Sequence, residues 1–140
     1  MTRWREIADA DVQQVVSLWE RCKLTRPWND PVTDIAFARR GPASTVLVWD
    51  AGGTVVAAVM VGHDGHRGAL YYLGVDPAHQ AKGLGSQVLD VAEEWLRQRG
   101  VWKINIQVRG DNAQAISFYE KLGFTANAVV SLGKTIRRTA

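Results

Sequence analysis

Cysteine is nearly absent from this sequence of 140 residues, because Cys22 stands alone. A single thiol excludes an intramolecular disulfide, and no set of cysteines is present to form a structural zinc site. No apolar run approaches the ~20 residues of a membrane span, and Arg3, Arg5 and Glu6 lie where a signal peptide needs an apolar core. We therefore expect a soluble cytoplasmic protein with no membrane partner.

A large excess of one charge is also lacking. Lys and Arg number 17 against 14 Asp and Glu, which gives a net charge of +3 and a pI near 9.3. This excess is consistent with an anionic ligand or with an ordinary solvated surface, and it is too small to indicate a nucleic-acid partner. Repeats and low-complexity segments are missing too, and 46% hydrophobic residues suit a single domain, residues 1–140.

Two helices are predicted in the first part of the chain. Asp9 is expected to cap the first, whose apolar residues recur at spacings of three and four over residues 12–22 and include Cys22. A loop with two prolines, residues 26–31, separates it from a shorter helix at about residues 33–40.

Two further helices are predicted later. Residues 88–96 continue an apolar face that begins at Leu84, and Gly100 closes this helix. Asp111 or Asn112 caps the last helix, which ends at Gly123.

Strands are predicted where β-branched and aromatic residues cluster between turn residues. The element order is strand, two helices, three strands, helix, strand, helix, strand. Three antiparallel strands followed by a strand, helix, strand crossover give an α/β fold, a mixed sheet with helices on both faces. After the first strand, the expected spans are 46–49, 55–61, 69–75, 103–108 and 128–132.

The segment from Gln80 to Ser86 joins a strand-like run to a helical one and is the most informative in the chain. Its glycines let the backbone approach a ligand, and the unpaired amides of a helix's first turn can bind a pyrophosphate, with Lys82 adding a positive charge. The segment is not a P-loop, since Gly-Lys-Ser/Thr is missing, nor a dinucleotide fingerprint, since Val88 occupies the third glycine position. A tight turn with a glycine cap is the alternative interpretation.

Two motifs follow one another here: Arg/Gln-x-x-Gly-x-Gly/Ala, and Asn followed by a Tyr seven residues later and then Leu-Gly-Phe. Together they resemble the GNAT-superfamily N-acetyltransferases over nearly the whole chain. Residues 26–31 and 62–68 look like those of the small bacterial YpeA-type acetyltransferases. The matching residues are Gln80, Gly83, Gly85, Asn112, Tyr119, Leu122, Gly123 and Phe124.

The resemblance implies an acyl-CoA N-acyltransferase (GNAT-like) fold, with a mixed, mostly antiparallel sheet of about six to seven strands flanked by about four helices. It implies acetyl-CoA as cosubstrate and no metal, in a cleft where the fourth and fifth strands splay apart and pantetheine pairs like a strand. Gly74 is expected to mark the bulge that begins the splay. The implied cofactor-binding residues are Leu73, Val75, Gln80, Ala81, Lys82, Gly83, Leu84, Gly85, Ser86, Asn112 and Tyr119.

The resemblance also implies the chemistry. The backbone N–H of Val75 or its neighbour would serve as oxyanion donor, and Tyr119 as the general acid that protonates the departing CoA thiolate. The alternative for Tyr119 is packing with Phe118 and Leu122. Cys22 lies away from both motifs, so we expect direct attack by the amine in a ternary complex without a covalent enzyme intermediate.

No general base is evident, since Ala69 and Gln107 stand where many relatives have Glu. Asp30, Glu20 and Asp64 are candidates, and each has an ordinary alternative: a helix cap, a solvated helix charge and a turn residue. A weakly basic amine, such as an α-amine, needs less help because a larger fraction of it is neutral near pH 7.5.

Trp28, Asp30 and Tyr72 are the expected substrate residues. Trp28 beside Asn29 and Asp30 suits an amine's stem and its cation, although Trp28 plugging the core is an equal alternative. Tyr71 or Tyr72 would shape the pocket.

We interpret His63, Asp64 and His66 as turn residues rather than metal ligands. The expected partner is a small-molecule or peptide amine. Three alternatives stay open: a non-catalytic CoA-binding regulatory module, an acetyltransferase acting on protein N-terminal α-amines, and a homodimer formed through the last strand and the basic tail. Nucleic-acid binding by that tail, Lys134, Arg137 and Arg138, is not expected.

Overall fold

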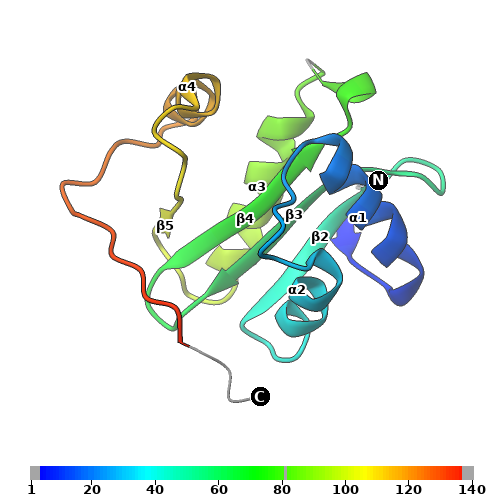
Figure 1. Cartoon of the computed structure of the whole chain (residues 1–140), viewed down its shortest axis with the longest axis horizontal. Helices are drawn as coiled ribbons and strands as arrows, with labels where there is room; N and C mark the ends of the chain where they lie inside the picture. Colours follow the sequence, from blue (N-terminus) through cyan, green and yellow to red (C-terminus); the bar gives the residue numbers. More distant parts are fainter. Residues whose placement is uncertain (1–3, 81, 137–140) are drawn as a thin grey trace. The chain divides into compact units, whose positions relative to one another are not determined.

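The computed structural model describes residues 4–80 and 82–136 of the 140. Ala81, Arg137 and Arg138, which the sequence analysis singled out, lie outside these residues. The chain divides after Gln107 into two compact units. The first contains a sheet and three α-helices, and the second contains one α-helix (Figure 1). Along the described ranges, no helix is both long and apolar enough to cross a membrane.

The sheet of the first unit has its strands in sequence order. The first four pair antiparallel, and the last pair is parallel. The predicted mixed, mostly antiparallel sheet is therefore confirmed, with five strands among the described residues in place of six to seven. The strands are β1 (Trp4–Glu6), β2 (Ser44–Asp50), β3 (Val55–His63), β4 (Gly68–Val75) and β5 (Ile104–Asn105).

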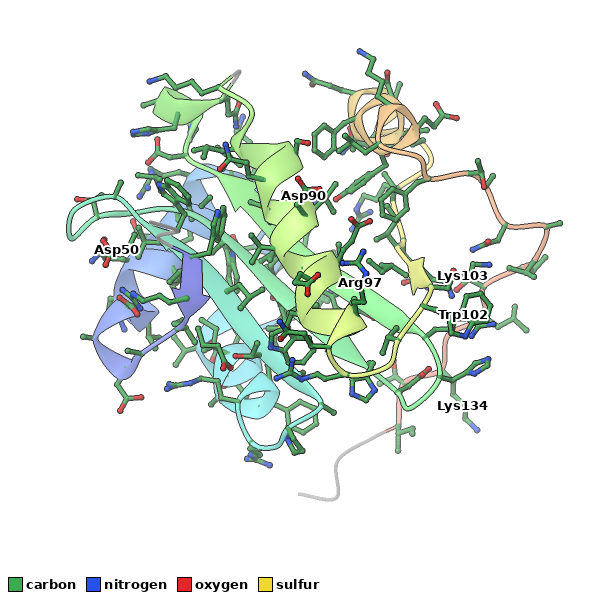
Figure 2. All side chains as sticks on the ribbon, turned by 180° about the vertical axis from the view of Figure 1, so that it is seen from behind. Asp50, Asp90, Arg97, Trp102, Lys103 and Lys134 are labelled. Carbon is green, nitrogen blue, oxygen red and sulfur yellow. The ribbon has the colours of Figure 1, made fainter. Side chains whose placement is uncertain are left out.

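Helices cover both faces of this sheet (Figure 1). α1 (Val12–Arg21) and α2 (Pro31–Ala38) bury their apolar residues on one face, and α3 (Leu84–Arg97) packs on the other. Asp90 and Arg97 project from the solvent side of α3 (Figure 2). The core on the α1 and α2 face consists of Ile7, Val15, Leu18, Trp19, Ile35, Val46, Val48, Val55 and Ala58.

The starts of α1 and α2 differ from prediction. Asp9 does not cap α1; it lies in a 3-10 turn, Asp9–Asp11, and pairs with Arg39 at 2.7 Å. Asp30 caps α2 by accepting a hydrogen bond from the Val32 amide at 3.1 Å. α2 begins with a proline two residues earlier than expected, because proline suits the first position of a helix, where its missing N–H is not needed.

The second unit contains α4 (Ala113–Lys121). Asn112 caps it, since its Oδ1 accepts a hydrogen bond from the Ala115 amide at 3.1 Å. Residues 125–136 have neither helix nor strand, so the strand predicted at 128–132 is wrong. Val129 and Val130 are 76% and 83% exposed. β-Branched residues favour strands on half-buried pleated surfaces, and these two have no such surface.

Candidate active site

The edge of β4 that faces β5 is paired only at its beginning. Gly68 and Ala69 stand opposite Ile104 and Asn105, and β5 then ends, far short of the predicted strand at 103–108. On the other side β4 stays paired with β3 up to Val75. Among the strands described in the first unit, none pairs with the later part of β4 on this side.

The direction of the amides along this edge follows from the register. Just past β4, the Asp76 amide donates to Val56 O at 2.8 Å, so Asp76 faces β3. Because antiparallel neighbours alternate in direction, the amide of Gly74 also faces β3, whereas the amide of Val75 faces the open edge.

A β-bulge lies at Tyr72 and Leu73, which together stand opposite the single residue Val59. Tyr72 has a left-handed backbone, φ +55, which costs a residue with a Cβ roughly 1–2 kcal/mol. The prediction of a bulge at Gly74 is therefore wrong. The left-handed residue of the bulge is Tyr72, which other contacts hold in place.

Tyr72 is held by two helices. Its ring stacks on Trp19 of α1, with centroids 4.3 Å apart and planes 14° apart. Its hydroxyl donates to Asp34 Oδ2 of α2 at 2.7 Å. Burial, this hydrogen bond and the charges of Asp34 and Asp30 raise the pKa of Tyr72, so the phenol stays protonated at neutral pH.

Gly74 serves close packing instead. A Cβ there would lie 3.1 Å from Cys22 Sγ and 3.3 Å from Trp19 Cδ1. Next to it, Val75 O accepts hydrogen bonds from Cys22 Sγ at 3.3 Å and from Gln80 Nε2 at 3.1 Å. Burial raises the pKa of the Cys22 thiol, which lowers the share of reactive thiolate at neutral pH.

The glycine loop leads into α3 as predicted. Gly83 is the residue before the helix, with φ +79, a conformation that glycine adopts without strain. A Cβ at Gly83 would meet no atom within 4 Å. Leu84 is buried, Lys82 is exposed, and Gly85 and Ser86 are half-buried. The first-turn amides of an α-helix have no intrahelical acceptor, and Gly83 has no side chain to cap them.

In the second unit, Tyr119 lies on α4. Its ring packs edge-on against Phe118 and Phe124, with centroids 5.2 and 5.4 Å away. Burial raises the pKa of its phenol. Tyr119 therefore packs against Phe118, as the alternative interpretation expected. The phenol of Tyr119 stays protonated, so its hydroxyl can still donate a hydrogen bond. Asn112, an expected cofactor residue, uses Oδ1 to cap α4.

The ordinary interpretations hold for two of the candidate bases. Asp30 uses both oxygens at the start of α2, accepting from the Val32 amide and from Thr33 Oγ1 at 2.8 Å. Asp64 accepts from the amides of His66 and Arg67, and His63 Nδ1 accepts from the Gly65 amide, as in a turn.

Glu20 is exposed on α1. Trp28 is 69% exposed, so the alternative that it plugs the core is wrong. Asp34 was missed. Its only sequence signal is a position one helical turn after Asp30, and nothing in the sequence links it to Tyr72.

Three comparisons place the chain among known proteins. The model of the acetyltransferase (GNAT) family matches residues 5–124. An acetyltransferase of Sodalis glossinidius is 46% identical over 127 residues, which are 90% of this chain and 89% of that protein.

Solved structures share the fold. The ribosomal-protein-S18-alanine N-acetyltransferase of Escherichia coli is 26% identical, with a TM-score of 0.76 and coverage of 91% of this chain and 80% of that one. An aminoglycoside 6'-N-acetyltransferase of Acinetobacter haemolyticus is 18% identical, with a TM-score of 0.78 and coverage of 96% and 99%. The family match over most of the chain leads to one conclusion: this protein belongs to the GNAT family of acetyltransferases.

Proposed function

We propose that the protein transfers the acetyl group of acetyl-CoA to a primary amine by direct attack in a ternary complex. The observation that carries the proposal is the junction of β4 and α3, where an open strand edge is followed by an uncapped helix N-terminus. The family match spans residues 5–124, across both compact units, which supports one acetyltransferase domain.

The N-terminus of α3 suits the pyrophosphate of acetyl-CoA. The amides of Leu84, Gly85 and Ser86 and the positive end of the helix dipole attract a diphosphate, and Gly83 leaves its approach open. Residues 77–89 contain Lys82 and no Asp or Glu. The segment therefore offers a diphosphate attraction without a repelling carboxylate.

The open edge of β4 suits the other end of the cofactor. Pantetheine carries two amides, and a carbonyl of one of them can accept a hydrogen bond from the Val75 amide as an added strand would. The acetyl carbonyl would then accept from the amide of Leu73 or Val75. Such a donor strengthens as negative charge develops on the oxygen, and it is worth roughly 3 kcal/mol in related acyl transfer.

In the proposed reaction the amine nitrogen attacks the thioester carbon, and the C–S bond breaks as the tetrahedral intermediate collapses. The attacking nitrogen loses a proton to solvent water, and Tyr119 gives its phenolic proton to the departing thiolate and afterwards regains one from solvent. Its raised pKa keeps the phenolic proton in place until the thiolate departs. Trp28, Asp30 and Tyr72 are proposed to contact the acceptor. The exposed Trp28 ring supports this role, since aromatic faces attract cations.

Calorimetric titration with CoA and acetyl-CoA tests the cofactor site, and release of free thiol tests turnover against small amines and N-terminal peptides. Ser86→Asp should weaken CoA binding at least tenfold, because it places a carboxylate beside the diphosphate. The same change favours helix formation, since an acid in the first turn complements the dipole. Gln98→Glu adds the same charge at the other end of α3 and should leave binding unchanged.

Binding with turnover would support the enzyme and identify the acceptor class. Binding of both ligands without turnover on any amine would favour the regulatory module over catalysis. Absence of CoA binding would refute the proposal.

A further inference from the structure

The bulge in β4 depends on contacts outside the strand. Tyr72 is one of only two non-glycine residues with positive φ among those described, and a strained backbone persists only where its surroundings over-determine it. Two restraints reach Tyr72: the Trp19 ring stacked on its face and the Asp34 carboxylate bonded to its hydroxyl. The two residues come from different helices. Trp19 fixes the plane of the Tyr72 ring, and Asp34 fixes the position of its hydroxyl.

Both restraints are themselves fixed. Trp19 is fully buried in α1. Asp34 lies on α2, where Ile35 and Ala38 are buried against the sheet and the Asp30 cap fixes the first turn. The Asp34 amide donates to Asp30 O at 2.9 Å, so Asp34 belongs to the regular part of the helix. The Tyr72 ring therefore has one defined position.

The position of Tyr72 controls the neighbouring amide. The extra residue of a bulge changes the direction in which the local peptide groups point, and Leu73 is the second residue of this bulge, directly bonded to Tyr72. We propose that Asp34 is a positioning residue, which holds the β4 bulge through Tyr72 and thereby aims the Leu73 amide at the acetyl carbonyl. This inference rests on the proposed function, because the carbonyl belongs to acetyl-CoA.

In this proposal Asp34 acts by holding the Tyr72 hydroxyl in place, and its charge is not needed. The Tyr72 hydroxyl needs an acceptor at the place of Oδ2, and an amide oxygen provides one as well as a carboxylate does. A role as proton acceptor or as anchor for a cationic substrate would need the negative charge instead. Asp34→Asn separates these two possibilities, because it keeps the acceptor and removes the charge.

Kinetics with three variants test the proposal. Tyr72→Phe keeps the ring on Trp19 but removes the hydroxyl, and Asp34→Ala removes its acceptor. Both should lower kcat at saturating substrates by roughly tenfold or more, since oxyanion donors act on the transition state. Their affinity for CoA, which has no acetyl carbonyl, should stay within about twofold of wild type. Asp34→Asn should retain kcat within about threefold, and Asp90→Asn, an exposed site on α3 (Figure 2), should match wild type.

NMR provides a readout that needs no acceptor amine. The amide signal of Leu73 in the ligand-free protein should shift in Tyr72→Phe and Asp34→Ala and stay near its wild-type position in Asp34→Asn. An Asp34→Asn variant as impaired as Asp34→Ala would overturn the proposal, as would a Tyr72→Phe variant with unchanged kcat or an unmoved Leu73 amide. A wild-type protein that binds no CoA would instead refute the proposed function, and the Leu73 signals would still test the bulge.

Discussion

Replacing Gly74 by alanine tests how closely α1 packs on β4. The added Cβ would lie 3.1 Å from Cys22 Sγ, 3.2 Å from Leu24 Cδ1 and 3.3 Å from Trp19 Cδ1. These groups have to move by a few tenths of an ångström. Such overpacking costs roughly 1–3 kcal/mol, and the lower entropy of the unfolded alanine chain offsets roughly 0.4–1 kcal/mol. The difference is a net loss of roughly 0–2.6 kcal/mol in the free energy of unfolding, and we expect a value near the middle of that range, about 1 kcal/mol.

Urea unfolding followed by tryptophan fluorescence measures this loss. Gly41→Ala is the matched control, because a Cβ at Gly41 meets no atom within 4 Å. In a Cys22→Ala background the cost of Gly74→Ala should be smaller, since the nearest obstructing atom is gone. If Gly74→Ala is as stable as Gly41→Ala, the close packing of α1 on β4 is refuted.

Two other predictions concern ionisable groups. Asp11→Asn removes a carboxylate bonded to Arg5 at 2.6 and 3.0 Å and to the Ala8 amide, and should lower the free energy of unfolding by roughly 1–3 kcal/mol. The hydrogen bond from Arg5 lowers the pKa of Asp11, so its stabilisation is complete above the unfolded pKa near 3.9 and is lost as pH falls through the lower folded pKa. Unfolding curves of wild type and variant should therefore converge in acid, and a constant difference down to pH 2 would contradict the assignment. Tyr119→Phe should lower kcat roughly a hundredfold. Because burial raises the pKa of Tyr119, any loss of kcat caused by its ionisation should occur at higher pH than for a free tyrosine; unchanged turnover of Tyr119→Phe with chemistry rate limiting would exclude it as the acid.

Local signals allowed much of this fold to be predicted from the sequence. Glycines at 83, 100 and 123 adopt the left-handed conformations that end or begin helices, and Asn112 caps α4 through its own side chain. Each of these contacts involves residues within a few positions of one another. The glycine loop before α3 was predictable for the same reason, since a glycine before an apolar helical pattern defines a helix N-terminus wherever the helix packs.

The residues proposed to contact the acceptor depend on contacts between distant segments. The Tyr72 hydroxyl meets Asp34 across 38 positions of sequence, and neither residue type indicates the other. Placing the bulge at Gly74 followed from glycine's conformational freedom, but a tyrosine takes the left-handed backbone because two helices hold its ring. Tertiary contacts decide which residue takes a strained backbone conformation, and local sequence propensity does not reveal these contacts.

α1 and the proposed cofactor edge form one packed assembly. Arg21 pairs with Asp76 at 2.7 Å, Cys22 donates to Val75 O, and Gly74 leaves room for the α1 residues beside it. The chain then enters the loop that carries Trp28, so this loop starts from a point fixed against β4. Because Trp28 is exposed in this loop, we infer that changes at Trp28 alter acceptor choice while acetyl-CoA affinity persists. Trp28→Ala should accordingly raise KM for the amine and leave the dissociation constant of CoA within about twofold; equal losses in both would show that loop and cofactor edge are coupled.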